Sequence, residues 1–119
     1  MTPGDITKSM YLASPYSSDS ARVVNQRHRD VCKAAGGMIN LGKVVFSPIA
    51  HSHDIARICG IQGDFATWAK QDAYWIRKLD EFGVLMLPGW DESVGVKAEI
   101  QLAVEFNKPV FYIDPEPWL

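Results

Sequence analysis

The sequence predicts an α/β fold: a doubly wound, mainly parallel sheet of four or five strands with helices on both faces. Four short apolar runs alternate with segments of helical periodicity, a pattern typical of parallel sheets that are covered on both sides. The chain has 119 residues, the size of one domain, so we expect residues 1–119 to form a single unit. Right-handed crossovers would place the loops that follow the strands along one edge of the sheet.

The elements follow from hydrophobic patterning and from turn signals. The predicted strands are the apolar runs at 10–13, 44–46, 84–87 and 110–113. The predicted helices cover about 20–41, 65–82 and 94–107. A short extra helix is expected over 54–59, capped by Asp54 and ended by Gly60. The loops at the carboxyl edge are then 14–19, 47–53, 88–93 and 114 onward. This outline is flavodoxin-like or Rossmann-like and does not specify a function.

The composition excludes several function classes. Twelve Lys and Arg residues against fourteen Asp and Glu residues give a net charge of −2, so a basic nucleic-acid-binding surface is not expected. The apolar runs are far shorter than the roughly 20 residues of a membrane span, and the first residues carry no export signal. Cys32 and Cys59 are isolated, which fits reduced thiols better than a disulfide or a zinc site. We therefore expect a cytoplasmic protein that binds neither nucleic acid nor membrane.

One carboxylate falls on the apolar face of the last predicted helix. The residues that share this face at helical spacing are Val96, Ile100, Ala103 and Phe106. Glu99 lies among them, in the second turn of the helix. A carboxylate against a core costs several kcal/mol unless it is paired, hydrogen-bonded or neutral. Glu99 therefore either reaches solvent at the edge of this face or belongs to a site.

Asp72 repeats the anomaly on the preceding helix. It lies between Trp68 and Trp75 in the predicted buried stripe, although Asp is a poor residue for a helix interior. Asp72 is therefore either a structural acceptor for a backbone group or a group that faces a cavity. Two acids that point inward from consecutive helices are typical of paired carboxylate chemistry, in which one attacks or stabilises and the other donates a proton.

Two loops at the carboxyl edge are candidate anion sites. Ser93 suits a helix N-cap and Gly95 leaves room for a ligand at the free N–H groups, although an ordinary capped helix has the same pattern. The first loop supplies the hydroxyl groups of Ser14, Tyr16 and Ser17. Neither G-x-G-x-x-G nor G-K-[ST] is present, which disfavours dinucleotide redox chemistry and P-loop phosphoryl transfer.

The histidines and aromatic residues extend the candidate site. His51 and His53 are expected in a loop, where they would contact a base or a sugar or bond the entry of a helix. No H-E-x-x-H motif or nearby third ligand is present, so we expect no metal. Serine or cysteine hydrolase chemistry is likewise unsupported, because no G-x-S-x-G elbow exists. The aromatic side chains that either stack on a planar base or pack in the core are Tyr16, Trp68, Tyr74, Trp75 and Trp90.

Three segments together resemble a known superfamily. They are YLASPYS at 11–17, Asp72 with Asp80, and SVGVKAE at 93–99 followed by Leu102 and Ala103. In order and spacing they resemble the nucleoside 2-deoxyribosyltransferase superfamily, including its 2′-deoxynucleoside 5′-monophosphate N-glycosidase branch. The segment SPIAHSH at 47–53 is most similar to a small branch, the DUF1937 proteins. The resemblance covers nearly the whole chain.

The resemblance implies a doubly wound parallel sheet and cleavage or transfer at the N-glycosidic bond of a nucleoside or nucleoside 5′-monophosphate. It implies that Glu99 is the nucleophile that forms a covalent glycosyl-enzyme, Asp72 the acid that protonates the leaving base, and Tyr11 the residue that orients Glu99. Ser93 stands where the nucleotide hydrolases of the superfamily receive a 5′-phosphate, with the hydroxyls of the first loop as further candidates. Those hydrolases carry an Arg in the first loop, and Arg22 is a candidate replacement. No metal or organic cofactor is implied.

Two other functions remain open on the sequence alone. A Glu on a similar fold also cleaves the nicotinamide bond, so the substrate could instead be an NAD-derived nucleotide. The protein could also be a non-catalytic nucleotide-binding or oligomeric module. We expect a homo-oligomer, either a dimer or a tetramer, because so short a chain leaves much apolar surface exposed.

Overall fold

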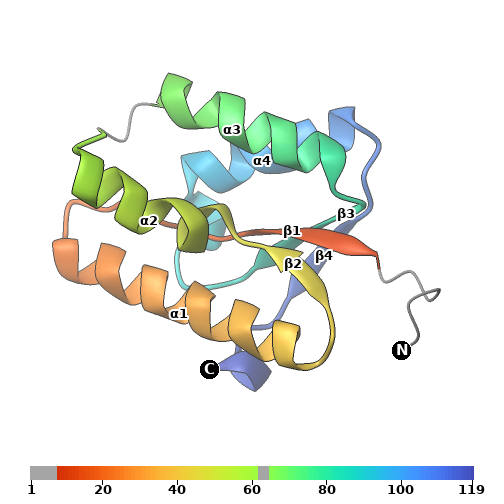
Figure 1. The fold of residues 1–119 in the computed structure, drawn as a ribbon, viewed down its shortest axis with the longest axis horizontal. Helices are drawn as coiled ribbons and strands as arrows, with labels where there is room; N and C mark the ends of the chain where they lie inside the picture. Colours follow the sequence, from red (N-terminus) through yellow and green to blue (C-terminus); the bar gives the residue numbers. More distant parts are fainter. Residues whose placement is uncertain (1–7, 62–64) are drawn as a thin grey trace.

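A computed structural model describes residues 8–61 and 65–119. In these residues, four parallel strands form one sheet with the order β2-β1-β3-β4 (Figure 1). The strands are β1 (Ser9–Ala13), β2 (Val44–Phe46), β3 (Glu81–Leu85) and β4 (Val110–Ile113). The chain passes from β1 to β2 on one side and then returns to β3 on the other side of β1. The predicted doubly wound α/β fold is confirmed.

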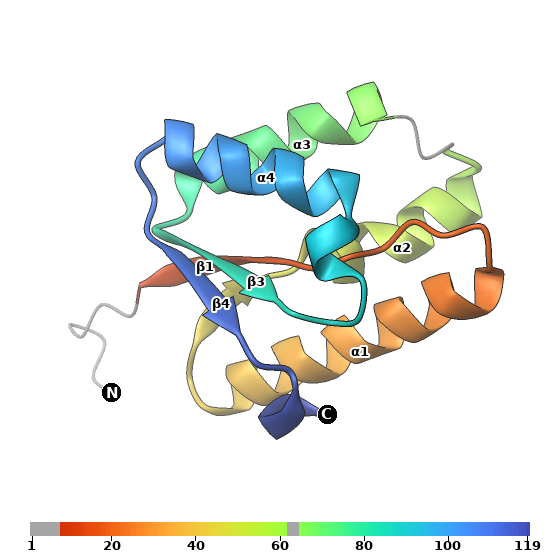
Figure 2. The ribbon, with the colours of Figure 1, turned by 180° about the vertical axis from the view of Figure 1, so that it is seen from behind.

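The helices cover both faces of this sheet. They are α1 (Ala21–Asn40), α2 (Pro48–Cys59), α3 (Phe65–Lys78) and α4 (Val94–Glu105), with short 3-10 helices η1 (Trp90–Glu92) and η2 (Glu116–Trp118). Helices α3 and α4 lie together on one face, whereas α1 and η2 lie on the other (Figures 1 and 2). Helix α2 packs beside α1 near the carboxyl ends of the strands. None of the helices in the described part of the chain has the length and apolar character of a membrane span.

The sheet separates two apolar cores, and the alternation of side chains along β1 places residues in each. Tyr11 and Ala13 are fully buried in the core under α3 and α4, together with Phe82 and Val96. Leu12 points to the opposite face and packs in the core under α1. Tyr11 is thus the large polar side chain that β1 directs toward the helices carrying Asp72 and Glu99.

The boundary between α3 and β3 differs from the prediction. Residues 79–82 do not continue the predicted helix, because α3 ends at Lys78. Phe82 is instead a fully buried strand residue in β3, which spans 81–85 rather than 84–87. Asp80 fixes this boundary, because its Oδ2 accepts hydrogen bonds from the backbone N–H and the hydroxyl of Ser9, at 2.8 and 3.0 Å. The start of β3 is therefore set by a contact with Ser9 of β1, which lies 71 positions before Asp80 in the sequence.

The start of α2 also differs, and the prediction that Asp54 caps a short helix is wrong. The cap is Ser47, whose hydroxyl accepts from the Ala50 N–H at 3.0 Å, and Pro48 occupies the first turn. Asp54 lies inside the helix, so His51 and His53 are helical rather than loop residues. The expected end is confirmed, because Gly60 forms the C-cap with a left-handed backbone at φ 65°.

Candidate active site

A cleft of about 960 Å³ opens at the carboxyl edge of the sheet. Its walls come from the loops after β1 and β3 and from all four α-helices, α1 to α4. The strand order reverses direction between β1 and β3, and the crevice beyond such a reversal is where open α/β sheets bind ligands. The topology therefore places the cleft at the position where this fold holds its functional groups.

Two acids that line this cleft, Asp72 and Glu99, both interact with the buried Tyr11 behind them. The Tyr11 hydroxyl donates a hydrogen bond to Oε2 of Glu99, and Asp72 interacts with the same hydroxyl. Both carboxyl groups line the cleft. The Tyr11 ring is held by stacking on Phe82, with 5.4 Å between ring centroids. Three elements that are far apart in the sequence thus converge on one hydroxyl.

Local sequence explains why both acids point inward. Helix α4 begins at its cap Ser93, whose hydroxyl accepts from the Val96 N–H at 3.2 Å. With this start fixed, Val96 and Ala103 are buried against the sheet, and Glu99 lies on the same face, one turn from each. On α3, the buried Ile76 places Asp72, four residues earlier, on the inner face.

Burial dominates the electrostatics of the two acids. It raises the pKa of Glu99 to about 8, the nearby Asp72 carboxylate adds to this increase, and the Tyr11 hydrogen bond opposes it. Burial also raises the pKa of Asp72 to about 6, again opposed by Tyr11. Burial and both carboxylates raise the pKa of Tyr11 well above its ordinary value, so its hydroxyl keeps its proton. Near neutral pH the two acids therefore hold one proton between them.

The first loop brings an unpaired hydroxyl to the cleft. Ser14 follows β1 directly, is only 3% exposed, and its Oγ has no hydrogen-bond partner within residues 8–61 and 65–119. A buried hydroxyl without a partner is costly unless a ligand or water satisfies it. Of the other predicted binding residues, Tyr16, Ser17, Ser93 and Gly95 also line the cleft.

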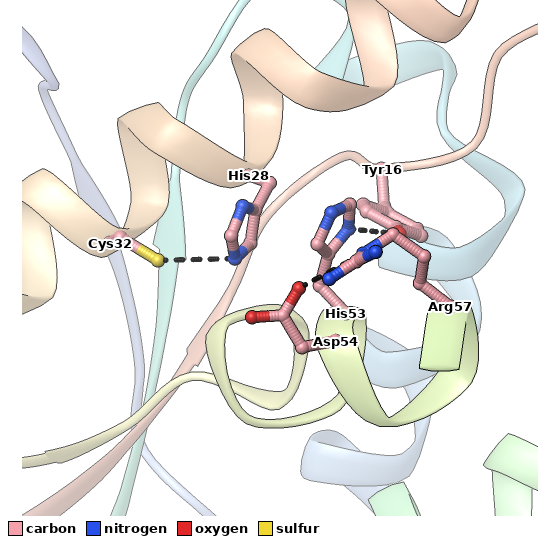
Figure 3. Close-up of polar contacts among 6 residues, drawn as sticks. All are labelled: Tyr16, His28, Cys32, His53, Asp54 and Arg57. Carbon is pink, nitrogen blue, oxygen red and sulfur yellow. Dashed lines mark hydrogen bonds and ion pairs between the residues drawn. The ribbon is translucent and has the colours of Figure 1, made fainter. Parts of the chain in front are cut away.

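Helix α2 contributes a polar cluster at the cleft wall (Figure 3). The Tyr16 hydroxyl lies 2.5 Å from Nδ1 of His53, and both residues line the cleft. The His53 ring stacks on His28 of α1, with centroids 3.8 Å apart, and Nε2 of His28 lies 3.4 Å from the Cys32 sulfur. The cluster therefore ties the first loop to α1 and α2.

Some predicted site residues are not brought to the cleft. The His51 side chain contacts Ser52 and Phe46 instead, and the Trp90 ring packs on Tyr112 at 5.6 Å. Trp75 stacks on Phe46 at 4.7 Å, so it belongs to the core. Of the aromatic candidates, Tyr16 and Trp68 line the cleft. Asp80, part of the resemblance, joins β1 to β3 and does not line it.

Sequence reasoning missed two cleft cations, Arg27 and Arg57. Arg22, the suggested replacement for a first-loop Arg, is exposed near the start of α1 and does not line the cleft, whereas Arg27 does. No local motif distinguishes Arg27 from the other basic residues of α1, because the groups that it contacts lie in two loops distant in the sequence. Among the described residues, no three His, Cys, Asp or Glu side chains gather where they could hold a metal ion.

Comparison with known proteins identifies the family. The sequence profile of a family described as a domain of unknown function (DUF1937) matches residues 8–114. The chain belongs to this family. The matched range of this DUF1937 protein runs from before β1 to just after β4, so it contains Tyr11, Asp72 and Glu99 together with both loops of the cleft. A search of the curated proteins finds no match.

Proposed function

We propose that this DUF1937 protein cleaves or transfers the N-glycosidic bond of a (deoxy)nucleoside 5′-monophosphate or the related nucleoside. The observation that carries the proposal is the convergence on the buried Tyr11 hydroxyl of Glu99 and Asp72, two acids that both line the cleft. Two acids that share one proton supply a nucleophile and a proton donor at the same time.

The first step forms a bond between C1′ of the sugar and a Glu99 oxygen while the bond from C1′ to the base breaks. The proton of the pair passes from Asp72 to the departing base, so charge balances. In the ligand-free protein the shared proton resides mainly on Glu99, because its pKa of about 8 exceeds the value of about 6 for Asp72, so this proton passes to Asp72 before Glu99 attacks. The Tyr11 hydrogen bond stabilises the ionised Glu99 that results. Positive charge that develops on the sugar in an oxocarbenium-like transition state favours an ionised Glu99 further.

The second step regenerates the acids. Water, or a second base in a transfer reaction, attacks C1′ and displaces Glu99. Asp72, now ionised, takes the proton that the attacking group releases. Every proton and bond is then restored without a metal or an organic cofactor.

Two features of the cleft support a 5′-phosphate on the substrate. The start of α4 opens into the cleft at Ser93, Val94 and Gly95, and free N–H groups at a helix start favour anions. Across the cleft, Ser17 and the unpaired Ser14 hydroxyl supply further donors. Arg27 adds positive charge to the same lining, which is the complement that a phosphate needs.

The decisive experiment compares base release from pooled nucleotides, including dCMP and dGMP, by wild type, Glu99→Gln and Glu105→Gln. Glu105 is exposed at the end of the same helix, so its variant is the matched control. We expect Glu99→Gln to lose activity by about 1000-fold or more and the control to keep it. A pentose adduct on the protein, seen by mass spectrometry, would mark the covalent intermediate. Base release by Glu99→Gln at the native rate would refute the assignment.

The size of the cleft favours an NAD-derived nucleotide as the second candidate substrate. At about 960 Å³ it approaches the upper end of small-molecule sites, so it can hold more than a mononucleotide. Incubation with NAD beside the monophosphates separates the two substrates by the base that is released. Thermal stabilisation by a nucleotide without any product would instead indicate a binding module.

We also propose that the protein is a homo-oligomer in the cytoplasm. Large apolar side chains remain exposed outside the cleft, among them Leu41 at 70%, Ile58 at 71% and Val104 at 61%, and burial against a second copy would remove them from water. Cys32 and Cys59 are both free thiols, which fits a reducing compartment. Sedimentation measures the assembly directly, and a monomer at all concentrations would contradict it.

A further inference from the structure

Arg27 contacts both loops at the rim of the cleft, although it belongs to neither. Its Nη1 donates to the Ser17 carbonyl at 2.9 Å and more weakly to the Tyr16 carbonyl at 3.5 Å. Its Nη2 donates to the Pro88 carbonyl at 3.2 Å, across 61 residues of sequence. One guanidinium group on α1 therefore joins the loop after β1 to the loop after β3.

Gly89 leaves the space that this guanidinium occupies. A Cβ atom at position 89 would lie 2.6 Å from Nη2 of Arg27, a distance at which one of the two groups must move. The backbone of Gly89 is also left-handed, with φ at 91°, a conformation that other residues adopt only under strain. The sequence thus provides both the turn and the space for the guanidinium of Arg27.

Neither strand pairing nor backbone hydrogen bonds join the two loops in the described part of the chain. The pairing of β1 with β3 ends at Ala13 and Val84, before either loop begins. Within the described part of the chain, no backbone hydrogen bond joins residues 14–20 to residues 86–93. Arg27 therefore supplies the hydrogen-bonded link between the loops beyond the end of the sheet.

The two linked loops supply hydroxyl groups to the proposed anion site, one loop from each side of the cleft. The first loop carries Ser14 and Ser17, whereas the second leads through η1 to Ser93 and the start of α4. Their separation decides whether both sides reach the same anionic group. The planar guanidinium holds this separation because its two ends bind different loops, a geometry that the single ammonium group of Lys does not reproduce.

We propose that Arg27 is a positioning residue, which holds the loop after β1 and the loop after β3 at the separation needed to bind one substrate anion between them. The inference rests on the proposed function for the identity of that anion. Its structural part, that Arg27 fixes the two loops, stands independently of any reaction.

The substrate test compares Arg27→Gln and Arg27→Lys with Arg29→Gln. Arg29 is the matched control, because it is exposed on the same helix and bonds the side chain of Gln26. We expect both Arg27 variants to raise KM for the nucleoside monophosphate by about 10- to 100-fold, with a smaller fall in kcat. The KM of the corresponding nucleoside, which lacks the phosphate, should change little. Restoration of the wild-type KM by Arg27→Lys would overturn the proposal, because charge alone would then suffice.

The structural test measures amide hydrogen exchange of the ligand-free protein. Arg27→Gln should speed exchange in residues 14–20 and 86–93, with a urea midpoint close to wild type, whereas Arg29→Gln should change neither loop. Gly89→Ala should also speed exchange in the same loops, because the added methyl group displaces the guanidinium and strains the left-handed backbone of residue 89. Unchanged exchange in both loops of Arg27→Gln would overturn the proposal. Absence of base release by the wild type would instead refute the proposed function and leave the exchange result intact.

Discussion

The hydroxyl group of Tyr11 stabilises the ionised forms of both cleft acids. Its hydrogen bond lowers the pKa of Glu99, whereas burial and the charge of Asp72 raise it. It also lowers the pKa of Asp72, so its loss raises both values. The ring itself is anchored by Phe82 and Phe46, which keeps the backbone of β1 in place when the hydroxyl is removed.

Tyr11→Phe should therefore shift the pH profile of base release to higher pH and lower the rate at pH 7 by about tenfold or more. The physical reason is that a larger fraction of Glu99 is protonated, and thus not nucleophilic, at neutral pH. Steady-state rates between pH 5 and 10 test this. Tyr74→Phe, at an exposed position of α3 outside the cleft, is the control. An unshifted profile in Tyr11→Phe would contradict the role of Tyr11.

At the scale of elements, the start of helix α2 is the difference between prediction and structure that most affects the site. Because α2 begins at Pro48, His53 lies on the helix face that packs against α1 and stacks on His28. Burial lowers the pKa of His28, and His53 lowers it further; Arg29 acts in the same direction, whereas Asp54 opposes it. Asp54 in turn pairs with Arg57 at 3.3 Å (Figure 3).

The histidine pair should make the packing of α1 and α2 sensitive to acid. A His with a lowered pKa binds fewer protons in the folded state than in the unfolded chain, so stability is present above about pH 6.5 and lost as the pH falls. His28→Phe keeps the stacked ring but cannot be protonated, so its urea midpoint should fall less than that of wild type between pH 7.5 and 5. His51→Gln, on α2 outside the pair, should behave as wild type. Equal losses in His28→Phe and wild type would show that the pair is not the cause.

At the scale of the whole molecule, the acids at the cleft oppose folding at alkaline pH. Their pKa values are raised in the folded state, to about 8 for Glu99 and about 6 for Asp72. The folded protein therefore binds more protons than the unfolded chain, and stability falls as the pH rises through these values. This decrease in the free energy of unfolding at high pH is the cost of keeping two carboxyl groups in a buried site.

Glu99→Gln should accordingly be more stable than wild type at pH 9, by on the order of 3 kcal/mol, and nearly equal to it at pH 5. The amide keeps an oxygen that accepts from Tyr11 but cannot ionise. Urea unfolding at both pH values gives the two free energies, with Glu105→Gln as the exposed control. A stability difference that does not grow with pH would contradict the raised pKa of Glu99.

The sequence by itself determined the features that depend on local periodicity. The alternation of apolar strands and amphipathic helices was enough to predict the doubly wound sheet. Helical spacing was likewise enough to place Glu99 and Asp72 on the inner faces of their helices. The start of α4 at Ser93 and the end of α2 at Gly60 follow from capping residues that act within one turn.

Only the tertiary structure decided which of these groups meet. The Tyr11 hydroxyl reaches Glu99 across 88 residues, and Arg27 reaches Pro88 across 61, through strand order and loop positions that no local pattern encodes. The same holds for the start of β3, which a side chain in another segment fixes through Ser9. Burial sets the pKa values of the two acids, and burial exists only once the sheet and its helices have packed together.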